Sequence, residues 1–370
     1  MRFKHQILFR MSLLVALAPI ASASTTWYVD GINGSNANNC KSLTSACKTI
    51  GHVIALVSSG DSIKLAAATY KEHLTIGISL KILGSGAMKT ILDGGGSQNR
   101  VVTISSNTAH VAISDVTISN GLSRSDGGGI LNNGVLTLLR STVTKNRAQL
   151  PCPPGQSCGI RGGGIFNAVG ASLTVGYSTV SANSASITNC SVFRCGTAGG
   201  GIFNGGTLVV YNSTISGNTT DVQAQGSGIY SGGTAIVRSS TLSANGAAVG
   251  AGIYGTANIS NSILSNGISS NCGGNVTSSG YNLSSDDSCN LTKTGDIINT
   301  DPLLGPLQYN GGPTQTMTLR AGSLAVDAGN PNGCRDGLGH LLTTDQRGMP
   351  RPDPEDTSGC DIGAFEKQSD

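Results

Sequence analysis

Short apolar stretches that alternate with polar residues recur along this chain and are separated by glycine-rich turns. Within segments such as 136–138, 173–175 and 208–210, apolar residues recur at the period of a β-strand with one buried side. Apolar residues at helical spacing occur near the N-terminus, within 47–57. The pattern predicts an all-β chain that begins with one short amphipathic helix.

One motif occurs five times, so the chain is built from repeats. Each copy opens with a glycine-rich turn and an isoleucine, and the copies lie at 127–132, 162–167, 199–204, 226–230 and 250–254. A second element, such as Ser-Thr-Val-Ser-Ala-Asn at 178–183, follows each copy. No segment inside the repeats has a helical period, so helices cannot link the strands. We expect a single-stranded right-handed parallel β-helix, in which each strand pairs with its counterpart one turn later.

Several residue types recur at fixed positions of the repeat and predict stacked columns. The asparagine that ends the second element should form a hydrogen-bonded asparagine ladder, at Asn146, Asn183, Asn218, Asn245 and Asn266. The isoleucine of each turn should form a core column, at Ile130, Ile165, Ile202, Ile229 and Ile253. The next residue is aromatic in four copies, at Phe166, Phe203, Tyr230 and Tyr254. These rings fit a packed column better than an open platform for sugars.

The ten cysteines come as close neighbours, which predicts local disulfides in an oxidising compartment. Pairing by proximity joins Cys40 with Cys47, Cys152 with Cys158, Cys190 with Cys195, Cys272 with Cys289, and Cys334 with Cys360. The second and third pairs lie in the two longest intervals between repeats, so they should staple insertions on one edge of the solenoid. The Cys-x-x-Cys spacing typical of zinc sites does not occur, and we expect no metal and no cofactor.

Residues 1–23 have the three parts of a secretory signal peptide. Basic residues (Arg2, Lys4 and Arg10) precede a short apolar run, and small residues lead to a cleavage site after Ala23. Removal of this segment leaves 20 basic against 20 acidic residues, so the mature chain lacks the positive charge of a nucleic-acid binder. No later stretch is long and apolar enough for a transmembrane segment. We expect a secreted or cell-surface protein.

Both ends of the mature chain resemble known families. The opening, through 27–30, 70–72 and 84–86, resembles the N-terminal segment of bacterial pectin-lyase-like β-helix proteins. The C-terminal segment resembles the choice-of-anchor Q domain of bacterial surface proteins, through the segments 301–307, 310–314, 325–329, 345–348 and 361–366. These resemblances imply a β-helix placed at the cell surface. The expected division is a signal peptide (1–23), an N-terminal cap (24–60), β-helix coils (61–299) and a choice-of-anchor Q-like C-terminal cap (300–370).

The distribution of acidic and histidine residues argues against catalysis. Glycoside hydrolysis needs two carboxylates beside the scissile bond, and calcium-dependent lyases need carboxylate ligands. Between Gly127 and Ser285 the only acidic residue is Asp221. No histidine has a serine or cysteine partner at a recognisable spacing, and no catalytic residue is predicted. We expect adhesion or glycan binding without catalysis. The alternative is a polysaccharide lyase or hydrolase that acts on uronate-type glycans.

Arginines provide the candidate ligand-binding residues. Arg124, Arg161 and Arg194 are expected in loops on one edge of the solenoid, where guanidinium groups would bind carboxylates or phosphates. The expected partner is an extracellular polysaccharide or a host- or cell-surface glycan.

A third hypothesis rests on outward hydroxyl groups in the second element of each repeat. A flat array of such groups would bind ice or another surface. Its members are Thr142 with Thr144, Thr179 with Ser181, Thr214 with Ser216, and Thr241 with Ser243.

Overall fold

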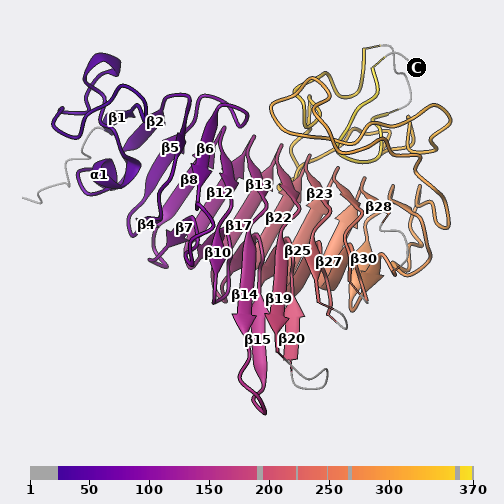
Figure 1. Cartoon of the computed structure of the whole chain (residues 1–370). Helices are drawn as coiled ribbons and strands as arrows, with labels where there is room; N and C mark the ends of the chain where they lie inside the picture. The colour runs from indigo at the N-terminus through magenta and orange to yellow at the C-terminus, as the bar shows by residue number, and fades with distance from the viewer. Residues whose placement is uncertain are drawn as a thin grey trace, which may run out of the picture.

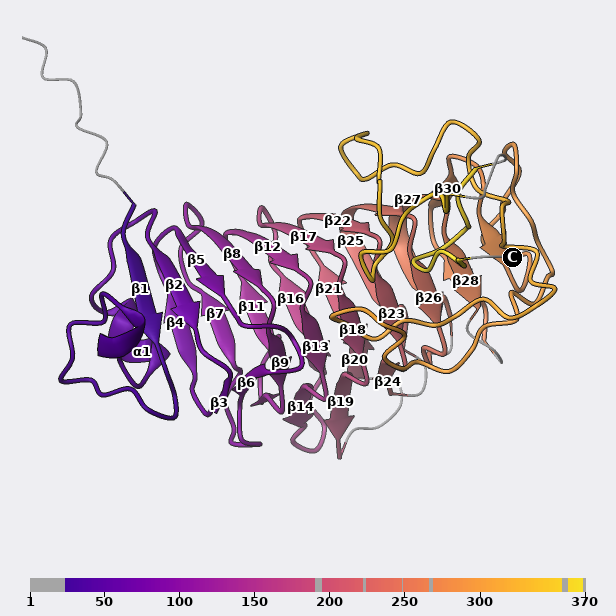
Figure 2. The same ribbon diagram turned by 90° about the horizontal axis from the view of Figure 1, so that it is seen from above.

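The structure, a computed structural model, describes residues 24–189, 195–221, 224–247, 249–265, 269–354 and 359–368. The predicted signal peptide, Cys190, Arg194 and Asn266 lie outside these described residues. The chain forms a single-stranded right-handed parallel β-helix, elongated along one axis with its coils side by side (Figures 1 and 2). The predicted fold class is confirmed.

The strands of successive coils stack into three parallel sheets. Sheets 1 and 2 are continuous, because β25 (Ile229–Arg238) and β27 (Ile253–Ser260) run through both. Sheet 1 also contains β4 (Leu74–Ile76), β7 (Val102–Ile104), β11 (Ile130–Asn132), β16 (Ile165–Asn167), β21 (Ile202–Asn204) and β29 (Cys272–Gly273). Sheet 2 also contains β1 (Thr26–Val29), β2 (Ser62–Leu65), β5 (Leu80–Leu83), β8 (His110–Ser114), β12 (Val135–Leu139), β17 (Ser172–Gly176), β22 (Thr207–Tyr211) and β30 (Val276–Ser278).

Sheet 3 consists of the second elements of the repeats and their counterparts in the outer coils. Its strands are β3 (Ala68–Tyr70), β6 (Thr90–Asp93), β9 (Thr117–Ser119), β13 (Thr142–Thr144), β18 (Thr179–Ser181), β23 (Thr214–Ser216), β26 (Thr241–Ser243), β28 (Ile263–Ser265) and β31 (Leu283–Ser284).

A further group of strands, which we call the wing, projects from the solenoid (Figure 1). It contains β10 (Leu122–Ser123), β14 (Arg147–Pro151), β15 (Cys158–Arg161), β19 (Ser184–Thr188), β20 (Cys195–Ala198) and β24 (Thr219–Thr220). The insertions that lengthen two repeats form most of the wing, and Ala148, Ile160 and Ala185 give it a small core of its own. Cys152 and Cys158 form a disulfide in the first insertion. Cys195 is also disulfide-bonded.

The isoleucine column forms the centre of the solenoid's core. Ile130, Ile165, Ile202, Ile229 and Ile253 pair in register along sheet 1, and each is 0% exposed. Burial of one such side chain contributes about 1.5–3 kcal/mol relative to leaving it in water. Every repeat therefore adds a similar increment to one continuous core.

The glycines of the repeat motif serve two different purposes. The first glycine of each copy adopts the left-handed conformation, as Gly162 does at a φ of 68°. Other residues adopt this conformation only with strain. The third packs against the asparagine ladder, and a Cβ atom on Gly164 would lie 2.9 Å from the side-chain carbon of Asn183. The glycine turn and the terminal asparagine of the second element therefore form one tightly packed corner.

The asparagine ladder runs through four coils of the described chain. The Nδ2 atom of Asn146 donates to Oδ1 of Asn183 at 3.0 Å. Asn183 bonds in the same way to Asn218 at 3.0 Å, and Asn218 bonds to Asn245 at 2.9 Å. Because each buried amide satisfies its neighbour, the ladder fixes the register of the coils.

Two further ladders were not anticipated from the sequence. Asn132 donates to Asn167 at 2.7 Å, and Asn167 donates to Asn204 at 2.8 Å. Serine hydroxyls at the start of the second element accept from the backbone N–H of the serine one coil earlier; they belong to Ser178, Ser213, Ser240 and Ser262. The repeat contains the pattern that predicts both ladders, because the asparagine and the serine each recur at a fixed position.

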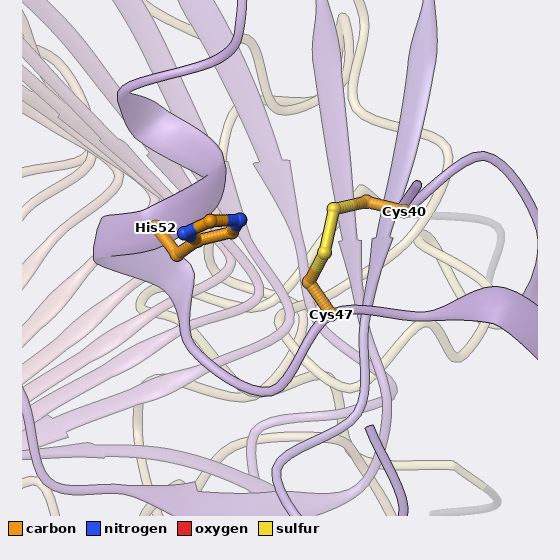
Figure 3. Close-up of side chains that lie close together, drawn as sticks. All are labelled: Cys40, Cys47 and His52. Atoms are coloured by element: carbon orange, nitrogen blue, oxygen red, sulfur yellow. A yellow bond between two sulfur atoms is a disulfide. The ribbon is translucent and has the colours of Figure 1, made fainter. Parts of the chain in front are cut away.

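The N-terminal cap covers the first coil. It contains η1 (Leu43–Ser45) and the short helix α1 (Ile50–Ile54), whose first N–H groups donate to the carboxylate of Glu72 at 2.8 Å. The Cys40–Cys47 disulfide holds the preceding loop beside this helix (Figure 3). Two other disulfides, Cys272–Cys289 and Cys334–Cys360, fasten the last coil and the C-terminal segment. Within the described chain, no helix is long and apolar enough to cross a membrane.

The C-terminal segment, from residue 300 onward, lies against the side of the solenoid as well as near its end (Figure 1). Its described part has no named helix or strand and is held by isolated antiparallel bridges such as Gln308 with Thr316. The contact with the coils combines a small apolar cluster, in which Ile263 and Leu283 pack against Ile362 and Phe365, with several polar groups. Thr214 donates to the side chain of Gln346 at 2.7 Å, and Thr179 donates to the carbonyl of Gln315 at 2.6 Å. The segment therefore covers part of the outward face of sheet 3.

This arrangement overturns the hypothesis of ice or surface binding through the hydroxyl array. Thr179 and Thr214 are 0% exposed and Thr241 is 2% exposed. The Thr241 hydroxyl accepts from the backbone N–H of Ala364, in the C-terminal segment. The array points outward from the strands, as expected, but the hydroxyl groups of Thr179, Thr214 and Thr241 bond to the C-terminal segment. The sequence pattern did not show that a distant segment would cover them.

The C-terminal segment buries charged side chains at this contact. Arg351 and Glu366 form an ion pair at 2.6 Å in which neither side chain is exposed. Arg351 also donates to Asn212 of the solenoid at 2.7 Å. Burial raises the pKa of Glu366 to about 7, even though Arg351 acts in the opposite direction, and burial likewise raises the pKa of Asp361 to about 6. The contact therefore includes a desolvated polar network beside its apolar cluster.

Candidate ligand-binding site

A pocket of about 400 Å³ lies where sheet 1 meets the wing. Thr75 of β4 and Thr103 of β7 come from the outward face of sheet 1, and Ser123 comes from β10, the first strand of the wing. The remaining lining residues are His73, Leu74, Gln98, Asn99, Arg100, Arg124 and Ser125. The pocket is open and polar. Its walls offer hydroxyl, amide and cationic groups, and no carboxylate lines it among the described residues.

Arg100 is anchored along one edge of its guanidinium group. Its Nε atom donates to the carbonyl of Gly127 at 3.3 Å. Its Nη2 atom donates to the carbonyl of Asp126 at 3.0 Å and to the hydroxyls of Ser123 and Ser125. Within the described chain, Nη1 has no hydrogen-bond partner. Burial lowers the pKa of Arg100, and the charge of Asp126 opposes that effect.

His73 is held at the rim of the pocket by two contacts. Its Nδ1 atom lies 2.9 Å from the carbonyl oxygen of Arg100, which can only accept, so the neutral ring carries its proton on Nδ1. Its Nε2 atom lies 2.8 Å from the hydroxyl of Ser97. The structure thus pairs a histidine with a serine that sequence spacing did not connect. This pairing orients the ring.

The three candidate arginines have different surroundings. Arg124 is exposed and lines the pocket, whereas Arg194 lies outside the described residues. Arg161 does not line the pocket and forms an ion pair with Asp126 at 2.7 Å. The backbone N–H of Arg161 donates to the same carboxylate at 2.8 Å, so Arg161 fixes the strand beside the pocket.

The aromatic column continues the line of Thr75 and Thr103 along sheet 1. The rings of Phe166 and Phe203 stack with centroids 5.1 Å apart and planes 4° apart, and Tyr230 and Tyr254 extend the stack. Neighbouring rings cover one another's faces. Since sugars stack on open ring faces, this geometry favours the interpretation as a packed column. Arg161 adds a cation–π contact, with its guanidinium carbon 4.8 Å from the Phe203 centroid.

The carboxylate next to the pocket is occupied by a structural partner. Asp126 follows the lining residue Ser125 and binds Arg161 at 2.7 Å. No pair of free carboxylates faces the pocket within the described ranges. The arrangement therefore lacks the acid and base of a glycoside hydrolase.

Two groups of side chains have the spacing of metal ligands. One is Cys40, Cys47 and His52 (Figure 3), and the other is Cys152, Cys158 and Cys195. In both groups the cysteines are disulfide-bonded. A disulfide supplies no thiolate, so neither group is suited to hold a zinc ion.

Comparisons with known proteins find similarity in fold. No family model matches the chain, and no curated protein matches its sequence. The pectate lyase Pel9A has a TM-score of 0.44 at 16% identity, over 94% of this chain and 97% of that chain. Pectin methylesterase from carrot has a TM-score of 0.33 at 11% identity, over 76% and 91%. The GH136 lacto-N-biosidase from Eubacterium ramulus has a TM-score of 0.28 at 10% identity, over 68% of each chain.

The pocket contains Arg124, which the sequence predicted as a ligand-binding residue, together with Arg100 and His73, which the sequence did not single out. Both missed residues lie before the five regular repeats, where the coils are irregular and no periodic signal places them on a particular edge. Their proximity depends on the register between β4 and β7, in which Thr75 pairs with Thr103.

Proposed function

We propose that this protein binds an extracellular glycan without cleaving it. One observation carries the proposal: an open pocket combines hydroxyl, amide and cationic groups at the junction of sheet 1 and the wing, and no described carboxylate lines it. Such groups match the hydroxyl-rich surface of a sugar, because each sugar hydroxyl both donates and accepts hydrogen bonds. The stacked coils and the wing provide a rigid support for the site.

The residues around the pocket support binding over catalysis. A lyase mechanism would need a general base, and Arg100 is the buried candidate. Its Nε and Nη2 atoms already donate to carbonyl and hydroxyl oxygens, which favours the protonated form. A protonated guanidinium binds ligands but accepts no proton.

The proposed location is outside the cell, either secreted or attached to the surface. Four disulfides between described cysteines fit an oxidising compartment, as does the signal-peptide pattern of residues 1–23. The resemblance of residues 300–370 to the choice-of-anchor Q domain fits a place on a cell surface.

The test is a glycan array probed with purified protein, followed by calorimetric titration of the glycans that bind. Thr103→Trp would fill the pocket without changing its charge, and we expect it to abolish binding. Thr137→Trp, at an outward position of sheet 2, is the matched control and should bind normally. Ligand cleavage is followed by absorbance of unsaturated uronates. Absence of glycan binding, or release of such product by the wild type, would contradict the proposal.

A further inference from the structure

The pocket carries an excess of positive charge that the protein does not neutralise. Arg100 and Arg124 line it, and the neighbouring carboxylate, Asp126, is engaged by both the backbone and the guanidinium of Arg161. Asp126 and Arg161 thus cancel each other. Two cationic side chains remain, and one of them, Arg100, is half-buried. A partly desolvated cation without a dedicated carboxylate is a favourable place for an anion.

From this arrangement we infer that the pocket is an oxyanion subsite that selects acidic sugars. This inference rests on the proposed glycan binding. The Nη1 edge of Arg100 and the side chain of Arg124 bind a carboxylate or sulfate group on one sugar ring. Hydroxyl groups of the same sugar bond to Thr75 and Thr103, which line the pocket beside the arginines.

Arg100 and Arg124 have different roles in this subsite. Four hydrogen bonds fix Arg100 before the ligand arrives, so little side-chain entropy is lost when Nη1 binds the anion. Arg124 is exposed and forms no ion pair with the described residues, so it adds charge and closes on the ligand. His73 borders the same space and holds the carbonyl of Arg100 in place.

The anion belongs to a glycan rather than to a nucleic acid. The chain without residues 1–23 has balanced charge, and the cationic groups lie in one pocket rather than along an extended stripe. A single pocket of about 400 Å³ has the size of a small-molecule site, which fits one or two sugar units.

The experiment is calorimetric titration with three probes: tri-galacturonic acid, its methyl ester, and a sulfated galactan trisaccharide. The methyl ester keeps the shape of the sugar and removes its charge. We expect the acid to bind at least about tenfold more tightly than the ester, since only the acid forms charge-assisted hydrogen bonds with the two arginines. Preference for the sulfated probe over the acid would keep the oxyanion subsite and assign it to sulfate.

Variants assign the effect to the pocket. Arg124→Gln should weaken binding of the charged probe about tenfold and leave the methyl ester unchanged. Arg100→Lys keeps the charge but loses the anchored fork, and should weaken the charged probe as well. Arg320→Gln removes an equal charge from an exposed site outside the pocket, and should have no effect.

Two negative outcomes are distinguishable. If the acid, its ester and other neutral glycans bind equally, the oxyanion subsite is refuted and glycan binding stands. If no glycan binds on the array or by calorimetry, both proposals fail.

Discussion

Sheets 1 and 3 both present threonines on their outward faces, but the C-terminal segment covers those of sheet 3 and leaves those of sheet 1 open. Thr75 and Thr103 of sheet 1 line an open pocket, whereas Thr179 and Thr214 of sheet 3 are 0% exposed under the C-terminal segment. Both faces arise from strands with the same alternation of inward and outward residues. The period of the sequence therefore determines which residues point outward but not which outward residues meet solvent.

The two faces also use arginine–carboxylate pairs in opposite ways. Arg351 and Glu366 meet at the covered face with neither side chain exposed. Arg161 and Asp126 meet beside the open pocket, with side-chain exposures of 46% and 23%. A fully buried pair has lost its hydration and depends on its partner, whereas an exposed pair is screened by water. The covered face should therefore be far more sensitive to changes in charge.

The largest effect is expected from Arg351→Ala. It removes a buried guanidinium that bonds to Glu366, to Asn212 and to the carbonyl of Gly363, and loss of one member of a buried pair costs about 3–5 kcal/mol. Urea unfolding measures the change in free energy. Hydrogen exchange should rise in β18, β23 and β26 of sheet 3, while β7 and β11 of sheet 1 stay protected.

The double variant Arg351→Met with Glu366→Leu serves as the control, because it removes both charges and should recover much of the lost stability. A loss below about 1 kcal/mol for Arg351→Ala, with unchanged exchange in sheet 3, would show that the covered face does not depend on this pair.

Stability should depend on pH through the same covered face. The folded chain holds the protons of Glu366 and Asp361 up to pH values of about 7 and about 6, because burial raises both pKa values. The unfolded chain releases them near their ordinary values of 4.5 and 3.8. Their contribution is complete below those ordinary values and is lost as pH rises through the folded values, so the melting temperature should fall from pH 5 to pH 8.

Circular dichroism melts at intervals of one pH unit would follow this decline, and Glu366→Gln should flatten it. Asp30 in the N-terminal cap acts in the opposite direction, because backbone N–H groups of Asn33 and Ile32 lower its pKa. Its contribution is lost only in acid. A melting temperature that rises between pH 5 and pH 8 would contradict the assignment to the C-terminal segment.

The same substitution on the two faces gives a direct comparison. Thr214→Val removes a buried hydroxyl that donates to Gln346, and leaving that amide oxygen unsatisfied costs about 1–3 kcal/mol. Thr103→Val on the open face should change stability by less than about 0.5 kcal/mol, since its hydroxyl faces the pocket. Both values come from urea unfolding. Equal losses at the two positions would mean that the C-terminal segment contributes nothing at Thr214.

The sequence predicted what is periodic and missed what is not. The isoleucine column and the asparagine ladder follow from residues such as Ile202 and Asn218, which recur at one position of every coil. Burial of Thr214 depends on its hydrogen bond to Gln346, which lies 132 residues later in the chain. No local sequence pattern predicts that contact. The pocket depends on Arg100, which lies in an irregular coil. Arg124 reaches the same pocket because it follows β10, the first strand of the wing. Sites of this kind arise where the repeat is interrupted.

A small effect on stability, and the sharpest test of the open face, comes from the ion pair of Arg161 and Asp126 beside the pocket. Arg161→Gln breaks an exposed ion pair and should cost no more than about 1 kcal/mol. It also leaves the negative charge of Asp126 beside Arg100 without the cation that neutralises it. Because that charge repels the anionic ligand, the acidic trisaccharide should bind several-fold more weakly. Asp126→Asn should strengthen binding instead, because it removes the nearest carboxylate. Calorimetry on both variants measures these changes, and shifts in the same direction would show that Asp126 does not act on the pocket through its charge.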